Sequence, residues 1–230
     1  MNNKLLRILP PDEFSTVAQH LEALPLPREF SVAGAGEPIE YVYFFETGIC
    51  SIVAKSPEGQ QVEAGIFGRE SFGPPAIAAG VQSTPLDIYV QVAGSGHRIA
   101  GDVFMHLLES CPRLSELVQI SAYLMALQTA FTSLSNAAHQ VDERLARWLL
   151  MCHDRTDGDE IALTHEFIAM MLAVRRPSVT TALHSLEGSR YIRAERGHIT
   201  IRSREGLEDF AADAYGVPEA EFAKLIGPLR

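Results

Sequence analysis

The sequence predicts an α+β protein built from an amino-terminal β domain of the jelly-roll kind, one long helix, and a carboxy-terminal helical domain that ends in a hairpin. Three observations support this prediction. Short strand-like runs with turn residues between them fill residues 30–91, a heptad pattern follows residue 111, and residues 142–204 suggest three helices and a hairpin. With 230 residues the chain is long enough for two domains.

The amino-terminal part is predicted to be mostly β structure, after an amphipathic helix expected over Pro11 to Leu24. Runs such as YVYFFETGICSIVAKS and QQVEAGIFG are separated by Gly, Pro and Glu-Gly turn signals, and LDIYVQVAG continues the pattern. The segment PPAIAAG predicts a helical turn between strands. Many short strands with frequent turns are typical of a barrel or jelly roll.

A long helix is predicted after Cys111, because apolar residues recur there at alternating spacings of three and four. The pattern continues through Ala138 and Val141. It is the seam of a coiled coil and predicts a homodimer. The alternative is a helix packed against its own domain. The predicted interface residues are Leu117, Ile120, Leu124, Leu127, Phe131 and Leu134.

The segment LTHEFIAMMLAVRRPSVTTALHSLE predicts two helices that cross over a tight turn. Thr164 is placed to cap the first helix, with Glu166 in its first turn. Ala173 stands where such turns often have glycine, at a cost of ~1 kcal/mol if its φ is positive. Pro177 fits the first position of the second helix. Apolar residues for the crossing recur in register, at Ile168, Ala169, Leu172, Val174, Val179 and Ala182.

The second helix of this pair begins with adjacent arginines and carries small hydroxyl side chains. Arg176 at the helix entry can donate two hydrogen bonds to a guanine, and hydroxyls suit phosphates or base edges. The run YIRAERGHITI predicts a hairpin, or wing, with His198 beside its turn. A helical hairpin that serves only packing is the alternative. The predicted DNA-contacting residues are Arg175, Arg176, Ser178, Thr180, Thr181, His184, Arg193 and Arg196.

Net charge does not exclude an anionic partner, although the formal value is −10. Residues 1–138 carry 7 basic and 14 acidic side chains, whereas residues 139–206 carry 10 of each, and all of these basic side chains are arginine. Positive groups can therefore gather on one face of the carboxy-terminal part. We expect any DNA binding to be local and salt-sensitive.

The remaining composition favours the cytoplasm. Three scattered cysteines without a CxxC pair argue against a disulfide framework and against an iron–sulfur cluster. We expect no signal peptide, because acidic residues and two prolines interrupt the amino terminus. The uncharged stretch between Glu116 and Asp142 is long enough to cross a bilayer, but its polar residues argue against insertion.

These motifs together resemble the Crp/Fnr (cyclic-AMP receptor protein/fumarate–nitrate regulator) family of bacterial transcription regulators. The segment from LTHEF to REGLE is similar to that family's winged helix-turn-helix, and GEPIEYVYFFETGICSIVAKSPEGQQVEAGIFGRESFG to its cyclic-nucleotide-binding-like jelly roll. The heptad helix stands where the family has its dimerisation helix. The resemblance covers nearly the whole chain.

The resemblance implies an effector domain over residues 1–110, a dimerisation helix over 111–138, and a DNA-binding domain with a carboxy-terminal helical extension over 139–230. It also implies a homodimer that binds an inverted repeat in double-stranded DNA and contacts RNA polymerase. The family's first recognition arginine falls on Arg176, its recognition glutamate on Pro177 and its second arginine on Thr181. The operator sequence is therefore left open.

The family's cyclic-nucleotide motif is missing. In an ungapped alignment from Gly73, Pro74 takes the place of its glutamate, Thr84 of its arginine and Pro85 of its serine. A buried phosphate needs a guanidinium or equivalent donors, so cyclic AMP is not expected as the effector. A different ligand in a pocket lined by Gly73, Ile77, Ala78, Thr84 and Thr129, and a vestigial pocket, both remain open. The third alternative is a haem-based sensor with His97 or His106 on the iron.

Two other classes of protein are alternatives to a regulator. A jelly-roll enzyme of the cupin class needs clustered histidines on adjacent strands, whereas the histidines of the β region begin only at His97. A partner-binding module that does not contact DNA is the second alternative. A gel shift with genomic fragments at several salt concentrations separates both from a regulator.

Overall fold

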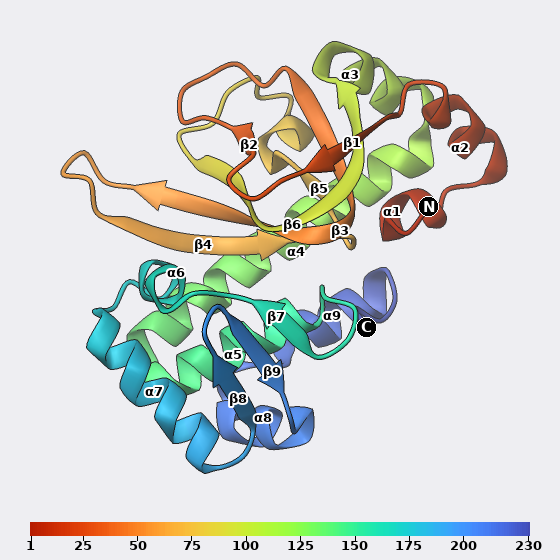
Figure 1. Cartoon of the computed structure of the whole chain (residues 1–230). Helices are drawn as coiled ribbons and strands as arrows, with labels where there is room; N and C mark the ends of the chain where they lie inside the picture. The colour runs from red at the N-terminus through yellow and green to blue at the C-terminus, as the bar shows by residue number, and fades with distance from the viewer. The chain divides into compact units, whose positions relative to one another are not determined.

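A computed structural model describes all of residues 1–230 (Figure 1). The chain forms two compact units. Unit 1 comprises Met1–Ala54 and Gly65–Ala126, and unit 2 comprises Lys55–Ala64 and Leu127–Arg230. The predicted α+β fold class is confirmed, whereas the functional boundaries at residues 110 and 138 stay predictions, because a division by contacts does not test where each function resides.

The β-roll is one antiparallel sheet of six strands. The order of neighbouring strands in the sheet is β1 (Glu22–Leu26), β6 (Asp87–Ala100), β3 (Tyr41–Lys55) and β4 (Gln61–Phe67). In addition, β2 (Ser31–Ala33) pairs with β6, and β5 (Phe72–Gly73) pairs with β3. β6 and β3 pair from Tyr41 with Ala100 to Val53 with Asp87. The predicted helical turn between strands is the 3₁₀ helix η1 (Pro75–Ala79).

Three helices of unit 1 flank the strands: α1 (Lys4–Arg7), α2 (Pro11–Ala18) and α3 (Gly101–Ser110). The helix expected over Pro11 to Leu24 is too long, because α2 ends at Ala18 and the chain then enters β1. Pro25 disfavours helical backbone at the residue before it, and Leu24 instead pairs with Gly96 of β6. Sheet pairing therefore overrides the amphipathic pattern.

Aromatic side chains fill the centre of unit 1. Phe44, Phe72 and Phe104 come from β3, β5 and α3, and their ring centroids lie 6.0–6.3 Å apart. All three are at most 1% exposed. Contact between rings from two strands and a helix fixes α3 against the sheet, since each ring buries a large apolar area.

Helix α4 (Pro112–Ala138) is the long helix that the heptad pattern predicts. Its start is held by a distant carboxylate, because Glu13 of α2 accepts hydrogen bonds from the backbone N–H of Arg113 at 3.0 Å and of Leu114 at 2.9 Å. This helix is long and apolar enough to cross a bilayer by length and composition alone, a test that core helices of soluble proteins also pass.

Two residues of the predicted dimer seam are covered within the single chain, and the seam itself stays a prediction. Leu117 is fully buried and Leu124 is 7% exposed within the single chain, so neither offers surface to a partner. Ile120, Leu127 and Phe131 are half-buried, and Leu134 is 51% exposed. The exposed line of α4 lies beside the predicted one, and it also has alternating spacings of three and four. It comprises Glu116, Gln119, Tyr123, Ala126, Ala130, Ser133 and Ala137.

Unit 2 begins, after the last turns of α4, with α5 (Val141–His153), followed by β7 (Glu160–Ala162), α6 (His165–Met171) and α7 (Arg176–Gly188). The hairpin β8 (Ile192–Glu195) and β9 (His198–Ile201) comes next, and then α8 (Arg204–Ala211), η2 (Ala212–Ala214) and α9 (Val217–Leu225). Helix α5 packs on α7 and α8, and α6 packs on α7. The hairpin and closing helices are confirmed, whereas β7, which pairs with β9, was not predicted.

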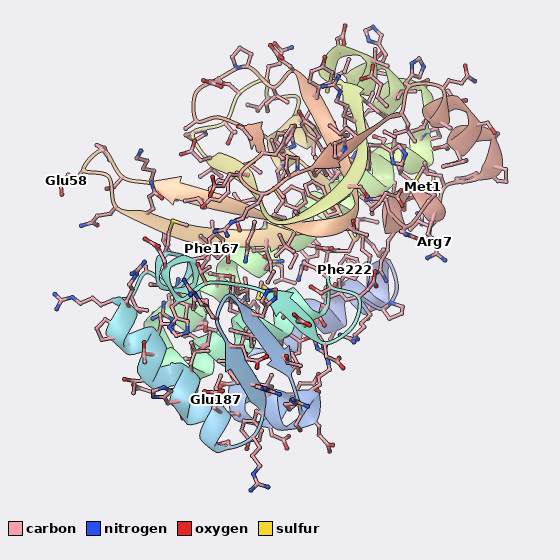
Figure 2. All side chains as sticks on the ribbon, viewed as in Figure 1. Met1, Arg7, Glu58, Phe167, Glu187 and Phe222 are labelled. Atoms are coloured by element: carbon pink, nitrogen blue, oxygen red, sulfur yellow. The ribbon has the colours of Figure 1, made fainter.

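Two more contacts hold unit 2 together. The β3–β4 hairpin (Lys55–Ala64) reaches α5, where Glu63 accepts a hydrogen bond from the indole N–H of Trp148 at 2.6 Å. The carboxy-terminal extension adds the buried Phe222 of α9 (Figure 2) and the terminal Arg230, which donates to the carbonyl oxygen of His153 at 3.1 Å.

Candidate nucleic-acid interface

The predicted helix-turn-helix is formed by α6 and α7. Thr164 caps α6, since its hydroxyl oxygen accepts from the N–H of Phe167 at 3.2 Å. At the turn, Ala173 has a φ of +51°, as the missing glycine suggested. The N–H of Val174 then donates to the carbonyl of Ala169 at 3.0 Å and closes the turn. The predicted cap is confirmed, and the condition attached to Ala173, a positive φ, is met.

Helix α7 starts one residue earlier than predicted. Arg175 is the extended residue that precedes the helix, Arg176 is the first helical residue and Pro177 the second. Pro177 still removes no hydrogen bond from the helix, because the first N–H groups of a helix have no partner within it. The two arginines therefore flank the helix entry, with Arg176 on its first turn.

The side chains of α7 divide into a buried and an open face. Val179, Ala182, Leu183 and Leu186 are at most 3% exposed and form the buried face. The predicted contact residues lie on the other side: Arg175, Arg176, Thr181 and His184 are exposed, and Ser178 and Thr180 are half-buried. The structure thus brings the predicted residues of α7 together on one surface.

Two of the hydroxyls are already engaged within α7. Thr180 donates to the carbonyl of Arg176 at 3.2 Å, and Thr181 donates to that of Pro177 at 3.1 Å. A phosphate oxygen only accepts hydrogen bonds, so each threonine would have to rotate its hydroxyl before donating to one. As they stand, these oxygens can accept from a base amino group.

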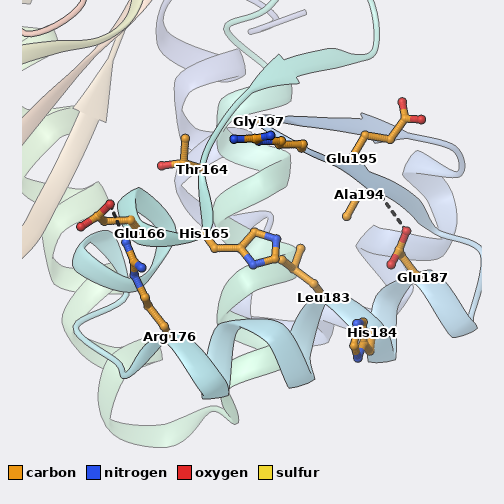
Figure 3. Close-up of a pocket in the computed structure, with 11 residues that line it drawn as sticks. Thr164, His165, Glu166, Arg176, Leu183, His184, Glu187, Ala194, Glu195 and Gly197 are labelled. Carbon is orange, nitrogen blue, oxygen red and sulfur yellow. Dashed lines mark hydrogen bonds and ion pairs between the residues drawn. The ribbon is translucent and has the colours of Figure 1, made fainter.

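A groove of about 940 Å³ separates the start of α6, the open face of α7 and the wing (Figure 3). The wing is fixed beside α7, because the Glu187 carboxylate accepts from the N–H of Ala194 at 2.8 Å. Both predicted wing arginines, Arg193 and Arg196, are exposed, and Arg196 lines the groove. The groove has charged groups of both signs: Glu166, Arg176, Glu187, Glu195 and Arg196.

Carboxylates of the same unit pair with several cations of this surface. Arg176 Nη2 lies 2.5 Å from Glu166 Oε2 of α6, and the two side chains are 60% and 78% exposed. On the wing, Arg193 lies 2.6 Å from Glu195, and His198 lies 3.0 Å from Glu160. Arg175 and Arg196 form no such ion pair.

These pairings were missed by sequence reasoning. The sequence predicts Glu166 only as a first-turn carboxylate, because it lies ten positions from Arg176 on a different helix. The crossing of α6 and α7 brings the two together, so no spacing rule within one helix finds the pair. The alternation of Arg193 and Glu195 on one strand is a signal that was available, since residues two apart share a face.

A second polar cluster lies where α5 ends. His153 is buried, donates from Nε2 to Asp159 at 2.9 Å and faces the guanidinium of Arg204 through Nδ1 at 3.3 Å. Burial lowers the pKa of His153, although the Asp159 hydrogen bond acts in the opposite direction. The buried Asp154 accepts from both Arg204 and Tyr215. Burial, followed by the Asp154 charge, raises the pKa of the Tyr215 phenol.

The predicted effector-pocket residues are less accessible than expected. A Cβ on Gly73 would lie 2.2 Å from the Phe67 ring, so the ring requires glycine there. Ile77 and Thr84 are buried, and the Thr84 hydroxyl oxygen accepts from the N–H of Leu86 at 3.3 Å. Ala78 is half-buried, as is Thr129, which belongs to unit 2.

The two histidines considered as haem ligands are on different elements. His97 lies on β6 with Nδ1 3.4 Å from Glu46, and His106 is exposed on α3 with Nδ1 2.8 Å from the carbonyl of Asp102. No group of three or more His, Cys, Asp and Glu side chains is placed to hold a metal ion.

Comparison with known families matches residues 143–210 to the Crp-like helix-turn-helix domain. No curated protein matches the chain by sequence.

Solved structures share the fold, and three of them illustrate the likeness. FixK2 from Bradyrhizobium japonicum has 17% identity and a TM-score of 0.70, with 84% of this chain and 98% of that chain covered. A putative Crp/Fnr-family regulator from Eubacterium rectale has 15% identity and a TM-score of 0.68, covering 90% and 97%. The c-di-GMP-responsive global regulator CLP from Xanthomonas campestris has 16% identity and a TM-score of 0.66, covering 84% and 99%.

Proposed function

We propose that this chain, whose residues 143–210 form a Crp-like helix-turn-helix domain in a Crp/Fnr fold, is a homodimeric, sequence-specific transcription regulator. The observation that carries the proposal is the open face of α7, where Arg175 and Arg176 flank the helix entry and the wing arginine Arg196 lines the same groove as Arg176. A helix with an arginine at its start and a wing beside it suits a major groove and its phosphates.

In this proposal α7 enters the major groove. Arg176 donates from its planar fork to the O6 and N7 acceptors of a guanine. Arg175, Ser178, Thr180, Arg193 and Arg196 mainly contact phosphates and fix the position of the helix. Thr181 and His184, one and two turns further along the exposed face, reach the neighbouring base pairs.

The dimer we propose pairs two copies of α4 along its exposed line. Ala126, Ala130 and Ala137 are small residues on that line, which lets two helix backbones approach closely, and Tyr123 and Leu134 add apolar area. Related by a two-fold axis, two α7 helices would then enter major grooves roughly 34 Å apart and read an inverted repeat.

The experiment that tests the function compares Arg176→Ala with Arg193→Ala. Sequences are selected from a random duplex library by the wild-type protein, and affinities are measured by anisotropy. Arg176→Ala is expected to cost about 1–3 kcal/mol on the selected duplex and to relax the preference at one base pair per half-site. Arg193→Ala is expected to weaken binding to all duplexes similarly. If neither variant changes affinity, the docking is wrong.

We further propose that an effector, if one is bound, is not held through a cyclic-nucleotide phosphate. Pro74 and Pro85 have no N–H to offer an anion, and the Thr84 hydroxyl is in a local contact with Leu86. Equilibrium dialysis with cyclic AMP tests this, and a dissociation constant in the micromolar range would contradict it. Haem remains an alternative that the absorption spectrum of the purified protein decides.

The remaining parts of the proposal concern the cell. A regulator of this kind works in the cytoplasm, in contact with RNA polymerase, and has no enzymatic activity. The alternative classes, a jelly-roll enzyme or a module that binds only proteins, predict no retardation of any genomic fragment at low salt. A gel shift across salt concentrations therefore separates them from the regulator.

A further inference from the structure

We propose that Glu166 is the specificity-determining partner of Arg176, acting by position rather than by its own contact with a base. The inference rests on the proposed function. It starts from one distance: Glu166 Oε2 lies 2.5 Å from Arg176 Nη2, and the pair joins the first turn of α6 to the first turn of α7 (Figure 3).

The ion pair engages only one side of the guanidinium. An arginine has five N–H donors in a rigid planar fork, and a guanine edge needs two of them. With Nη2 bound to Glu166, other donors of the fork remain available to a base. A carboxylate on one side therefore restricts the orientation of the side chain and leaves its reading edge open.

The same carboxylate lowers affinity for DNA in general. An arginine with no partner reaches the phosphates of any sequence, which adds affinity without discrimination. Glu166 holds this arginine away from phosphates, and its negative charge repels them. When a guanine is in place, the fork satisfies Glu166 and the base together, and exclusion of water strengthens both contacts. When the base is wrong, the fork stays paired with Glu166 and gains no base contact, while the carboxylate still disfavours the approach of phosphates.

The wing offers a matched comparison on the same surface. Glu195 pairs with Arg193 at 2.6 Å, and both ion pairs are open to solvent: Arg193 is 57% exposed against 60% for Arg176, and Glu195 is 53% exposed against 78% for Glu166. Arg193, however, is assigned to phosphates. Removing either carboxylate removes one negative charge from this surface, but only the loss of Glu166 is expected to change base preference.

The test compares the wild-type chain with Glu166→Gln and Glu195→Gln. The probes are the duplex that the wild type selects from a random library and a shuffled duplex of the same length and composition, measured by anisotropy at several KCl concentrations. For Glu166→Gln we expect the ratio of the two affinities to fall about tenfold, with the relaxation confined to the base pair that Arg176→Ala also relaxes. For Glu195→Gln both affinities rise together and the ratio stays within twofold.

Two further variants separate position from charge and from folding. Glu166→Asp keeps the charge on a shorter side chain that does not hold Arg176 in place. The ratio of the affinities for the selected and the shuffled duplex is therefore expected to fall almost as far as in Glu166→Gln. In an Arg176→Ala background, Glu166→Gln is expected to leave the ratio unchanged. Both side chains are exposed, and unchanged thermal unfolding of each variant confirms that the fold is intact.

The outcomes distinguish this inference from the function on which it rests. A wild type that selects no sequence overturns both. A wild type that selects a sequence while Glu166→Gln keeps the full ratio overturns only the role of Glu166. A fall in the ratio that persists without Arg176 also overturns it, because Glu166 would then act on the DNA directly.

Discussion

Ala173 has a backbone conformation that glycine adopts more easily. Its φ of +51° places the side chain close to the following carbonyl, a strain of ~1 kcal/mol or more for an L-residue. We therefore expect Ala173→Gly to raise the free energy of unfolding by up to about 1 kcal/mol, part of the gain being offset by the freer unfolded chain. Urea unfolding followed by circular dichroism measures the change.

A control for that substitution is Ala220→Gly. Ala220 is exposed within α9, where the backbone is helical, and the same change should lower stability by about 0.5–1 kcal/mol. If both substitutions lowered stability alike, the positive φ at the turn would not be a source of strain.

His153 gives unit 2 a dependence on pH. Burial lowers its pKa from 6.5 in the folded protein, so the folded state prefers the neutral ring and the unfolded state takes up the proton first. The stabilising contribution is present above about pH 6.5 and is lost as pH falls through the folded pKa. The free energy of unfolding should decrease by up to about 1.4 kcal/mol per pH unit in this range.

The measurement is a set of urea unfolding curves between about pH 5 and pH 8. His153→Gln, which does not titrate, should flatten the dependence, whereas His20→Gln, at an exposed position in unit 1, should keep it. An unchanged slope in His153→Gln would assign the dependence to other groups.

Among single residues, the sequence predicted which side chains are exposed better than it predicted which side chains form ion pairs. Arg176 was expected at an open helix entry and Thr164 as a cap, because both follow from local rules of helix ends. The acidic partners Glu166, Glu195 and Glu160 were not expected, because they depend on how helices cross and strands pair in three dimensions.

Helix α4 depends on a carboxylate from another helix. Glu13 accepts from two N–H groups at the start of α4, which lie about a hundred residues away in sequence. We expect Glu13→Ala to lower the free energy of unfolding by about 1–2 kcal/mol, since a helix cap of this kind satisfies donors that have no partner in the helix. Asp12→Ala, which removes the exposed neighbouring carboxylate, should change it by less than about 0.5 kcal/mol in a calorimetric comparison.

The exposed line of α4 makes a second prediction for an element. Ala130→Glu puts a charge in the centre of the proposed helix pair, where burial without a partner is costly. We expect the variant to sediment as a monomer at concentrations at which the wild type is a dimer. Ala223→Glu, on the exposed side of α9, should remain dimeric. A monomeric wild type would contradict the dimer itself.

Elements with a long, regular pattern were predicted well, and short ones were not. The heptad spacing located α4, but it did not indicate that Leu117 and Leu124 are buried within the single chain, because a periodic apolar pattern does not tell which partner covers it. β1 and β7 were missed, because five and three residues carry little periodicity and both strands form through pairing with distant segments.

For the whole molecule, the sequence predicted the order of the parts along the chain. It did not predict that a segment of the β-roll strands belongs to the compact unit of the helix-turn-helix. The switch from strand-like runs to a heptad, and then to paired helices, gave the α+β fold. No sequence signal indicated that residues 55–64, which comprise the end of β3, the turn and the start of β4, belong to the compact unit that contains the helix-turn-helix. That assignment depends on contacts such as the one between Glu63 and Trp148.

The same contact has a practical consequence. Trp148 is the only tryptophan of the chain, and its indole N–H is bound to the carboxylate of Glu63 on strand β4 of the β3–β4 hairpin. Its fluorescence therefore reports on a single location. Any event that separates the hairpin from α5 would change the emission wavelength and the fluorescence lifetime of Trp148. The native protein therefore contains its own spectroscopic probe and needs no attached dye.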